Sequence, residues 1–444
     1  MIHISDTQTG TKTIFKSHTE KRVALYVCGI TPYDYAHIGH GRCYVFFDVA
    51  YRFLTQLGYE VTYCRNYTDI DDKLLKKSAQ IYQDESKYLA VANNCIEQFK
   101  KDMTALNCIT PTHEPRVTEN IDPIITFIQE LINKKYAYAI NGSVYFSIEK
   151  FPGYGKLSHQ NRENLLSGTR HDVKEEKHNP LDFALWKSET EHFFWQSPWG
   201  IGRPGWHIEC SALAKKYLGD FVDIHGGGLD LIFPHHENEI AQSESLLGHD
   251  FVTYWLHVGL VMSNEEKMSK SLGNFVQLKD IFQEYDPMIL RYYYLSHHYR
   301  APLPFSYETM EGHAKAYKKL CILLNSVPAE TKLEHVYSQP IAEQMIGCLR
   351  DDFNTAAMLG ILFEHLNEVK QNIQLQCAVK MILQEMCGLT LEQGKEESLE
   401  YPEDIKQLLK QREKARVEKN WALADEIRTI IEDRGFQVQD KRIK

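Results

Sequence analysis

Residues 23–70 decide the fold, and they open with the run VALYVCG at positions 23–29. This run is apolar, rich in β-branched and aromatic residues and ended by glycine, which is typical of a buried strand. From Gly39 the apolar residues recur at helical spacing until Gly58, and VTYCRNYTDI at 61–70 returns to strand character. The order strand, helix, strand is the repeating unit of a parallel α/β sheet.

The alternation is interrupted and then resumes. Residues 81–135 have a helical period, 138–148 read as a hairpin turning on Asn141-Gly142, and 159–179 indicate an exposed loop. A helix at 207–218, a strand at 220–224, a helix at 234–247 and a strand at 252–261 follow. We therefore expect one α/β domain that is split by an insertion.

Beyond residue 304 the strand signals vanish. Apolar residues at 314–324, 342–369 and 379–387 repeat at intervals of three and four, which predicts a helical bundle. The polar stretch 389–401 precedes Pro402 and indicates a linker into a last module.

Composition sets wider limits on the function. A chain of 444 residues with 43% hydrophobic and 25% charged residues is typical of a globular protein of two to four domains. The net charge of -10 argues against wholesale coating of nucleic acid, but a local basic surface can still attract phosphates. The sequence has no secretion signal, membrane span or Cys-x-x-Cys pair, so we expect a cytoplasmic protein without a disulfide framework.

The first chemical motif is His37-Ile38-Gly39-His40, between the first strand and the first helix. Amides at a helix N-terminus favour phosphate, and two histidines there can donate hydrogen bonds to triphosphate oxygens. Alone, the motif is weak, and two surface histidines at a helix start are the commoner explanation of it.

The second motif is Lys267-Met268-Ser269-Lys270-Ser271, which follows a strand and an acidic turn. Cations placed there can stabilise the negative charge that develops on pyrophosphate as it leaves. A solvated lysine loop is the plain alternative. The two motifs in this order within an α/β chain favour an enzyme that activates a small carboxylate, such as an amino acid, with ATP.

A candidate metal site comes from separate segments. His235 and Glu239 are four residues apart and share one helix face, while His236 with Glu239 is a rival pair. Adding Cys28 and Cys210 gives two thiolates, an imidazole and a carboxylate, a ligand set that suits zinc. Spacing alone does not establish that the two cysteines meet.

With both signature motifs intact, the sequence resembles the class I aminoacyl-tRNA synthetases. The resemblance implies a Rossmann-type parallel-sheet catalytic domain with an insertion, followed by an α-helical bundle and a small C-terminal module. It also implies that the catalytic residues His37, His40, Lys267 and Lys270 handle the phosphates of ATP.

Longer segments resemble the cysteinyl-tRNA synthetase branch of this family, among them residues 65–73, 181–187, 205–211 and 223–239. That resemblance implies one zinc ion per chain held by Cys28, Cys210, His235 and Glu239, which selects L-cysteine by its sulfur. It implies a cysteine pocket of Gly29, Thr68, Trp206 and His225, and contact of Asp230 with the ribose of ATP. ATP would act with Mg²⁺, and the partner would be tRNA(Cys).

The same resemblance predicts the domain borders. The catalytic domain would cover 1–107 and 200–262, the insertion 108–199, the second signature loop and a stem-contact region 263–304, the bundle 305–390 and an anticodon-binding module 401–444. Residues 352–358 resemble the bundle signature, although Asn354 or Thr355 as a plain helix cap explains them equally well.

The C-terminal module would carry a basic stripe before Trp421, which could stack on an unpaired base. A solvated helix face is the alternative for its members Lys406, Lys410, Arg412, Lys414, Arg416 and Lys419.

We expect a monomer that charges tRNA(Cys). The first alternative is a related ligase that joins activated cysteine to a small-molecule amine, and the second is a non-catalytic regulator that binds zinc and nucleotide. The C-terminal module argues against the former, and the intact signature motifs argue against the latter.

Overall fold

The computed structural model describes residues 1–160, 177–191, 193–263, 266–267, 276–330, 332–392, 402–417 and 420–434. The chain folds as two units, residues 1–391 and residues 392–444. Among the described residues, no helix has the length and apolar character needed to cross a bilayer.

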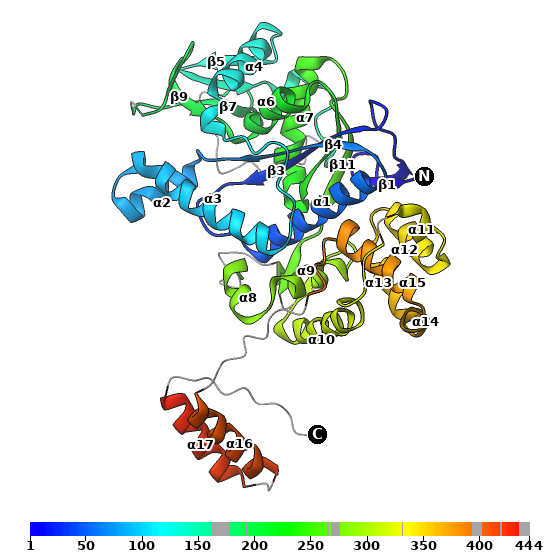
Figure 1. The fold of residues 1–444 in the computed structure, drawn as a ribbon. Helices are drawn as coiled ribbons and strands as arrows, with labels where there is room; N and C mark the ends of the chain where they lie inside the picture. Colours follow the sequence, from blue (N-terminus) through cyan, green and yellow to red (C-terminus); the bar gives the residue numbers. More distant parts are fainter. Residues whose placement is uncertain are drawn as a thin grey trace. The chain divides into compact units, whose positions relative to one another are not determined.

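A parallel sheet forms the centre of the first unit (Figure 1). Its described strands are β3 (Arg22–Ile30), β4 (Glu60–Tyr67), β10 (Val222–Gly228) and β11 (Val252–Val258), in the order β11-β10-β3-β4. Helix α1 (Ile38–Gln56) connects β3 to β4 and buries its apolar face, including Phe47 and Phe53, in the core. The predicted strand-helix-strand unit and the α/β fold class are thereby confirmed.

The strand order reverses at β3. The chain moves from β3 to its neighbour β4 on one side, and β10 pairs with β3 on the other side. Because loops leave such neighbouring strands in opposite directions, a crevice opens at their carboxyl ends. Cys28, Gly29 and the loop into α1 lie at this edge.

An inserted sheet follows β4 and helices α2 (Asp72–Tyr82), α3 (Tyr88–Ala105) and α4 (Ile121–Asn133). Its order is β5-β6-β7-β9-β8, with antiparallel pairs throughout. Its strands are β5 (Ala137–Ile140), β6 (Ser143–Phe146), β7 (Phe183–Ser188), β8 (Trp195–Ser197) and β9 (Gly200–Pro204).

The predicted hairpin is confirmed, since β5 and β6 pair around Asn141 and Gly142, which have φ values of 49° and 82°. The continuous helical period expected over 81–135 is wrong in its middle, because residues 106–120 run beside β4. There Arg65 and Tyr67 donate their amides to the carbonyls of His113 and Pro115. Most of the loop expected at 159–179 lies outside the described residues.

The second half of the sheet carries α6 (Trp206–Leu218) and α7 (Glu237–Leu247). The predicted helix at 234–247 starts later, because Ile232–His236 form a π-helical turn in which Phe233 is extended. The predicted strand at 252–261 is two strands. Gly259 separates β11 from β12 (Val261–Ser263), and a Cβ at Gly259 would lie 2.5 Å from the Ala301 carbonyl oxygen.

Strand β12 belongs to a small sheet that leads into the second signature motif. It pairs with β13 (Glu266–Lys267) and with β14 (Leu303–Phe305). Helices α8 (Leu278–Glu284) and α9 (Pro287–Leu295) follow.

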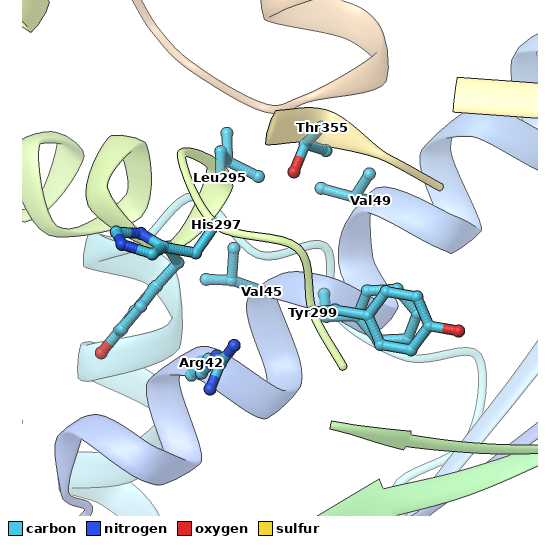
Figure 2. Close-up of a pocket in the computed structure, with 9 residues that line it drawn as sticks. Arg42, Val45, Val49, Leu295, His297, Tyr299 and Thr355 are labelled. Carbon is cyan, nitrogen blue, oxygen red and sulfur yellow. The ribbon is translucent and has the colours of Figure 1, made fainter. Parts of the chain in front are cut away.

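Arg42 of α1 ties this small sheet to the central one. Its guanidinium donates to the carbonyls of Gly259, Leu260, His298 and Ala301. Arg42 also borders a small pocket between α1, the end of α9 and Thr355 (Figure 2).

The predicted bundle is confirmed as α10 (Tyr307–Leu324), α11 (Leu333–Tyr337), α12 (Pro340–Arg350), α13 (Thr355–Glu364), α14 (Leu366–Gln371) and α15 (Ile373–Met381). The run expected at 342–369 is broken, because Asp352 and Phe353 have positive φ values of 63° and 51°. Asn354 then caps α13 by accepting the Ala357 amide, as the plain alternative predicted.

The break in the bundle is held by the start of the chain. The carboxylate of Asp352 accepts hydrogen bonds from the amide and hydroxyl of Ser5, at 2.8 and 2.7 Å. Ser5 lies in β1 (His3–Asp6), which pairs with β2 (Thr11–Ile14).

The second unit is a helical hairpin of α16 (Glu403–Val417) and α17 (Trp421–Asp433). The two helices pack through Ile405, Ile427 and Ile431. Arg412 is 6% exposed, so this member of the predicted basic stripe is packed within the hairpin instead of facing solvent.

Candidate functional site

A cleft opens at the carboxyl edge of the central sheet. It is lined by the end of β3, the loop into α1 and the segment after β10, together with Trp206 and residues 258–261. The sequence-predicted residues on its walls are Cys28, Gly29, His37, His40, Trp206 and Asp230. The fold thus brings the first signature motif and one candidate metal ligand into the same cleft.

The two signature histidines cap α1 reciprocally. His37 Nδ1 accepts the amides of Gly39 and His40, at 3.1 and 3.3 Å, while His40 Nδ1 accepts the amide of His37 at 3.3 Å. The rings stack with centroids 3.7 Å apart. Because both Nδ1 atoms accept, a neutral ring carries its proton on Nε2, which makes Nε2 a hydrogen-bond donor.

The second signature motif is described only in part. The backbone of Lys267 pairs with Met262 in the β12–β13 ladder, and Lys270 lies outside the described residues. The chain that emerges after this motif is fixed beside the first one. Ile38 donates its amide to the Val276 carbonyl, and Leu278 donates to the Ala36 carbonyl.

Four predicted metal ligands meet beneath the cleft. Cys28 Sγ lies 3.7 Å from Cys210 Sγ and 3.4 Å from Glu239 Oε1. His235 Nε2 lies 3.2 Å from the same carboxylate oxygen. All four residues are buried, so the two cysteines that spacing could not connect do meet here.

These distances fit a tetrahedral zinc ion. Bonds of about 2.3 Å to sulfur and about 2.1 Å to nitrogen or oxygen give tetrahedral edges of roughly 3.8 Å between sulfurs, 3.6 Å between sulfur and oxygen, and 3.4 Å between nitrogen and oxygen. Each distance in the cluster is within about 0.2 Å of its edge. In addition, Oε2 of the fully buried Glu239 accepts no hydrogen bond among the described residues, although His225 Nε2 lies 3.3 Å from it. The donor set and this orphaned oxygen both suit a cation.

A second set overlaps the first. Cys28, His225, His236 and Glu239 also converge, with Cys28 Sγ 3.6 Å from His225 Nε2 and 3.3 Å from His236 Nε2. The rival pair His236–Glu239 is wider, at 3.9 Å. Cys28 and Glu239 belong to both sets. The two candidate sets therefore differ only in their other two members, which are Cys210 and His235 in the first set and His225 and His236 in the second.

Burial sets the protonation of this cluster. It raises the pKa of Cys28 well above its usual value and lowers the pKa of His235 and His236 well below theirs. Both imidazoles are therefore neutral at pH 7, the form in which histidine binds metals.

The other predicted residues surround the cluster at different depths. Trp206 is 37% exposed and lies over His235, with ring centroids 4.2 Å apart. His225 is fully buried, with Nε2 3.3 Å from Glu239 Oε2, and does not line the cleft. Thr68 is also buried and accepts a hydrogen bond from Asn66 at 3.2 Å. Asp230 is exposed on the cleft wall.

Gly29 has a steric requirement. A Cβ at this position would lie 1.5 Å from the Asn66 carbonyl oxygen, so no other residue fits without a backbone shift. The Gly29 amide donates to Asn66 Oδ1 at 2.9 Å.

Three residues near the cluster escaped the sequence analysis. Asn66 Oδ1 lies 3.6 Å from Cys210 Sγ. His207 Nδ1 lies 3.0 Å from His235 Nδ1, and His257 Nε2 lies 2.7 Å from His236 Nδ1. Burial lowers the pKa of His207 and His257 to about 3, so both rings are neutral partners that orient the imidazoles beside them. In the sequence, Asn66 and His257 lie within predicted strands, and His207 lies at the start of a predicted helix. Nothing in the sequence relates them to the cluster.

Known proteins resemble the chain over nearly its whole length. A family model described as the catalytic domain of class I (C) tRNA synthetases matches residues 14–315, and one for the cysteinyl-tRNA ligase anticodon binding domain matches 399–443. A cysteine–tRNA ligase of Bacillus cereus is 44% identical over 458 residues, which covers 99% of this chain and 97% of that protein. The chain belongs to the cysteine–tRNA ligase family. A Bacillus cytotoxicus cysteine–tRNA ligase shows the same identity and coverage.

Solved structures support the fold assignment of this cysteine–tRNA ligase family member. A Mycobacterium tuberculosis methionyl-tRNA synthetase in complex with methionyl-adenylate superposes with a TM-score of 0.59. The match covers 83% of this chain and 92% of that one at 13% identity. At this identity the likeness shows a shared class I synthetase fold and carries no residue roles.

Proposed function

We propose that this chain activates L-cysteine with ATP and transfers the cysteinyl group to the 3′ end of tRNA(Cys). The observation that supports it is the meeting of Cys28, Cys210, His235 and Glu239 at the floor of the cleft whose wall carries His37 and His40. A sulfur-selecting cluster beside a phosphate-binding helix start matches what the activation of cysteine needs.

In the first step, a cysteine carboxylate oxygen attacks the α-phosphorus of ATP, and the bond to pyrophosphate breaks. The carboxylate is already ionised, so no protein base is needed, and positioning with charge stabilisation provides the acceleration. His37 and His40 would donate from Nε2 to phosphate oxygens, and Lys267 and Lys270 would neutralise charge on pyrophosphate, with Mg²⁺ as a further counter-ion. Asp230 would accept from the ribose hydroxyls.

In the second step, a terminal ribose hydroxyl of the tRNA attacks the carbonyl carbon of the adenylate, and AMP leaves. The family model for an anticodon-binding domain at residues 399–443 supports tRNA as the acceptor instead of a small amine. We propose that the chain acts as a monomer in the cytoplasm, as its resemblance to the family suggests.

Selection against serine needs more than shape. Steric and apolar differences between such close analogues give only about 1 to 3 kcal/mol. A zinc ion held by Cys28, Cys210, His235 and Glu239 would supply a soft Lewis acid that favours a thiolate over a protonated hydroxyl. Trp206 would cover the side chain of the amino acid, and Gly29, Thr68 and His225 would shape the pocket around it.

One reaction tests the function. Purified protein is incubated with labelled cysteine, ATP and total tRNA, and charged tRNA and adenylate are measured separately. We expect labelled tRNA. Adenylate without charged tRNA would instead support a ligase acting on a small amine, and the absence of both products would support a regulator. Accumulation of seryl-adenylate at equal amino-acid concentrations would contradict zinc-based selection.

Metal analysis of two variants separates the two ligand sets. Cys210→Ser removes a thiolate from the first set only, and His236→Gln removes an imidazole from the second set only. We expect wild type to bind about one zinc per chain, Cys210→Ser to lose it and His236→Gln to keep it. The opposite pattern would assign the ion to Cys28, His225, His236 and Glu239.

A further inference from the structure

Glu237 lies between the candidate ligands His235 and Glu239 in the sequence, but its carboxylate is not among the ligand atoms that converge in the cluster. It is 0% exposed, and its neighbour Asn238 is 2% exposed. On a helix, residue 237 is rotated by about 200° from both 235 and 239, so its side chain leaves the opposite side of the turn. What Glu237 contacts there therefore bears on how the ligands are oriented.

Glu237 is held by a turn of the inserted region. Its Oε1 accepts the Gly155 amide at 2.8 Å, and its Oε2 accepts the amides of Leu157 and Ser158 at 3.2 and 2.8 Å. Next to it, Asn238 Oδ1 accepts the Tyr154 hydroxyl at 2.6 Å. Among the described residues no lysine or arginine pairs with Glu237, so backbone amides alone stabilise this buried carboxylate.

The turn is shaped for this contact. Gly155 has a φ of 99°, and a Cβ there would lie 2.3 Å from the Gln160 carbonyl oxygen. Lys156 of the same turn pairs with Glu244 further along α7, at 2.7 Å. Residues 154–158 are thus attached to the helix at several points, and Glu237 accepts three of these hydrogen bonds.

Helix α7 begins without a side-chain N-cap. Its N-cap residue, His236, makes no side-chain capping bond, and the preceding π-helical turn contains the extended Phe233. The amide of Glu237 instead donates to the carbonyls of Ile232 and Pro234, so the preceding turn supplies the backbone partners at the start of α7. The hydrogen bonds from residues 155–158 to the Glu237 side chain attach this same turn to the inserted region.

We infer that Glu237 is a positioning residue. By accepting hydrogen bonds from the amides of Gly155, Leu157 and Ser158, its carboxylate sets the orientation in which His235 and Glu239 meet the metal. The inference rests on the proposed function, because it assumes that zinc binds at Cys28, Cys210, His235 and Glu239. Since coupling between two sites is reciprocal, metal binding must in turn strengthen the contact between Glu237 and the turn.

Chelator competition measures the first consequence. In Glu237→Gln one carboxylate oxygen becomes an NH₂ group that faces a backbone amide, so at least one of the three hydrogen bonds is lost. We expect this variant to hold zinc about 10- to 100-fold more weakly than wild type, the usual effect of losing an outer partner. Glu244→Gln is the matched control, because it loosens Lys156 of the same turn while leaving Glu237 intact, and its zinc affinity should match wild type.

Hydrogen exchange of the wild-type protein measures the second consequence and needs no variant. With zinc bound, the amides of Gly155, Leu157 and Ser158 should exchange about tenfold or more slowly than after zinc removal. Equal exchange with and without zinc, or equal zinc affinity in both variants, would overturn the inference. A wild-type protein that binds no zinc would instead overturn the proposed zinc site on which this inference rests, so the two failures are distinguishable.

Discussion

The side chains of the two signature histidines bind backbone amides, and this role is independent of any substrate. Each uses Nδ1 to accept main-chain amides at the start of α1, and this fixes the ring tautomer that presents an Nε2 proton. The spacing of three residues between them is the spacing of a capping box, so one geometry serves helix initiation and ligand binding together.

Replacing His37 by asparagine should separate these two roles. Asparagine is among the best N-cap residues and can accept the same amides, but its shorter side chain cannot place a donor where Nε2 lies. We expect an unchanged melting temperature and a fall in kcat for cysteine-dependent pyrophosphate exchange of about 10²- to 10³-fold. His37→Ala should lose stability as well, and equal stability of both variants would contradict the capping role.

Asp102 of α3 gives a pH-dependent effect on stability. Burial raises its pKa from 3.8 to about 6, although Gln98 donates to it at 2.8 Å. The folded state therefore holds a proton that the unfolded state has released, and stability falls as pH rises from about 4 to about 6. Asp102→Asn should match wild type near pH 4 and be more stable by about 1–2 kcal/mol at pH 8. Denaturant unfolding at both pH values checks this, and a pH-independent difference would refute it.

At the scale of elements, Arg42 joins the helix of the first motif to the strand that leads into the second. Burial lowers its pKa only to about 10, so the guanidinium remains charged at pH 7 while it satisfies four carbonyls. The backbone bonds of Ile38 and Leu278 fix the chain on the far side of that motif. Both ends of the second motif are therefore anchored to residues 36–42.

Substitution of Arg42 should damage stability and catalysis together. Arg42→Gln leaves several buried carbonyls without a donor, and we expect the free energy of unfolding to fall by about 2–4 kcal/mol. In the folded variant, kcat for pyrophosphate exchange should fall more than the affinity for cysteine, since the cysteine pocket is built by other elements. Arg22→Gln, which breaks an exposed pair with Glu60, serves as the control and should change stability by less than about 0.5 kcal/mol.

The elements were largely predictable because periodicity reports burial. The strand at β3, the helix α1 and the hairpin at Asn141-Gly142 follow from local sequence. The errors fall where tertiary contacts override local preference: the 106–120 segment pairs with β4, Gly259 bends at a close approach to Ala301, and Asp352 turns to reach Ser5.

The candidate site was predictable in a different way. The residues were identified through the resemblance to known synthetases, whereas the convergence of Cys28 and Cys210 is a property of the folded sheet. Asn66 and His207 lie in segments that carry the family resemblance, but nothing in the sequence pairs them or His257 with the cluster, since a buried polar residue is recognised only by its partners. The domain borders within residues 1–391 and the roles of the site residues stay predictions.

For the whole molecule, the cleft and the match to the anticodon-binding family model fall in different units of the chain. Residues 1–391 contain the cleft and the cluster, and residues 392–444 form the unit to which the anticodon-binding family model is matched. The buried Leu389 and Leu391 belong to the first core, and the Leu391 amide donates to the Tyr317 hydroxyl. The first unit therefore extends through Leu391.

Truncation after Leu391 should separate activation from charging. We expect the shortened protein to keep cysteine-dependent pyrophosphate exchange within about twofold of the full chain while its charging of tRNA(Cys) falls by at least about tenfold. Both assays are run on the same preparations, with full-length protein as reference. Undiminished charging by the shortened protein would show that the C-terminal unit is not needed for tRNA recognition.

The wide separation of the candidate metal ligands along the chain also determines when such a site can form during synthesis. Cys28 lies 182 residues before Cys210 and 211 residues before Glu239. A ribosome therefore exposes the first ligand long before the last, and the pocket closes only after β3, α6 and α7 have docked. Unlike a zinc finger, which requires its ion in order to fold, this chain would receive a zinc ion only after these elements have docked. We therefore expect protein made in zinc-poor medium to be folded but inactive, and to gain activity when zinc is added.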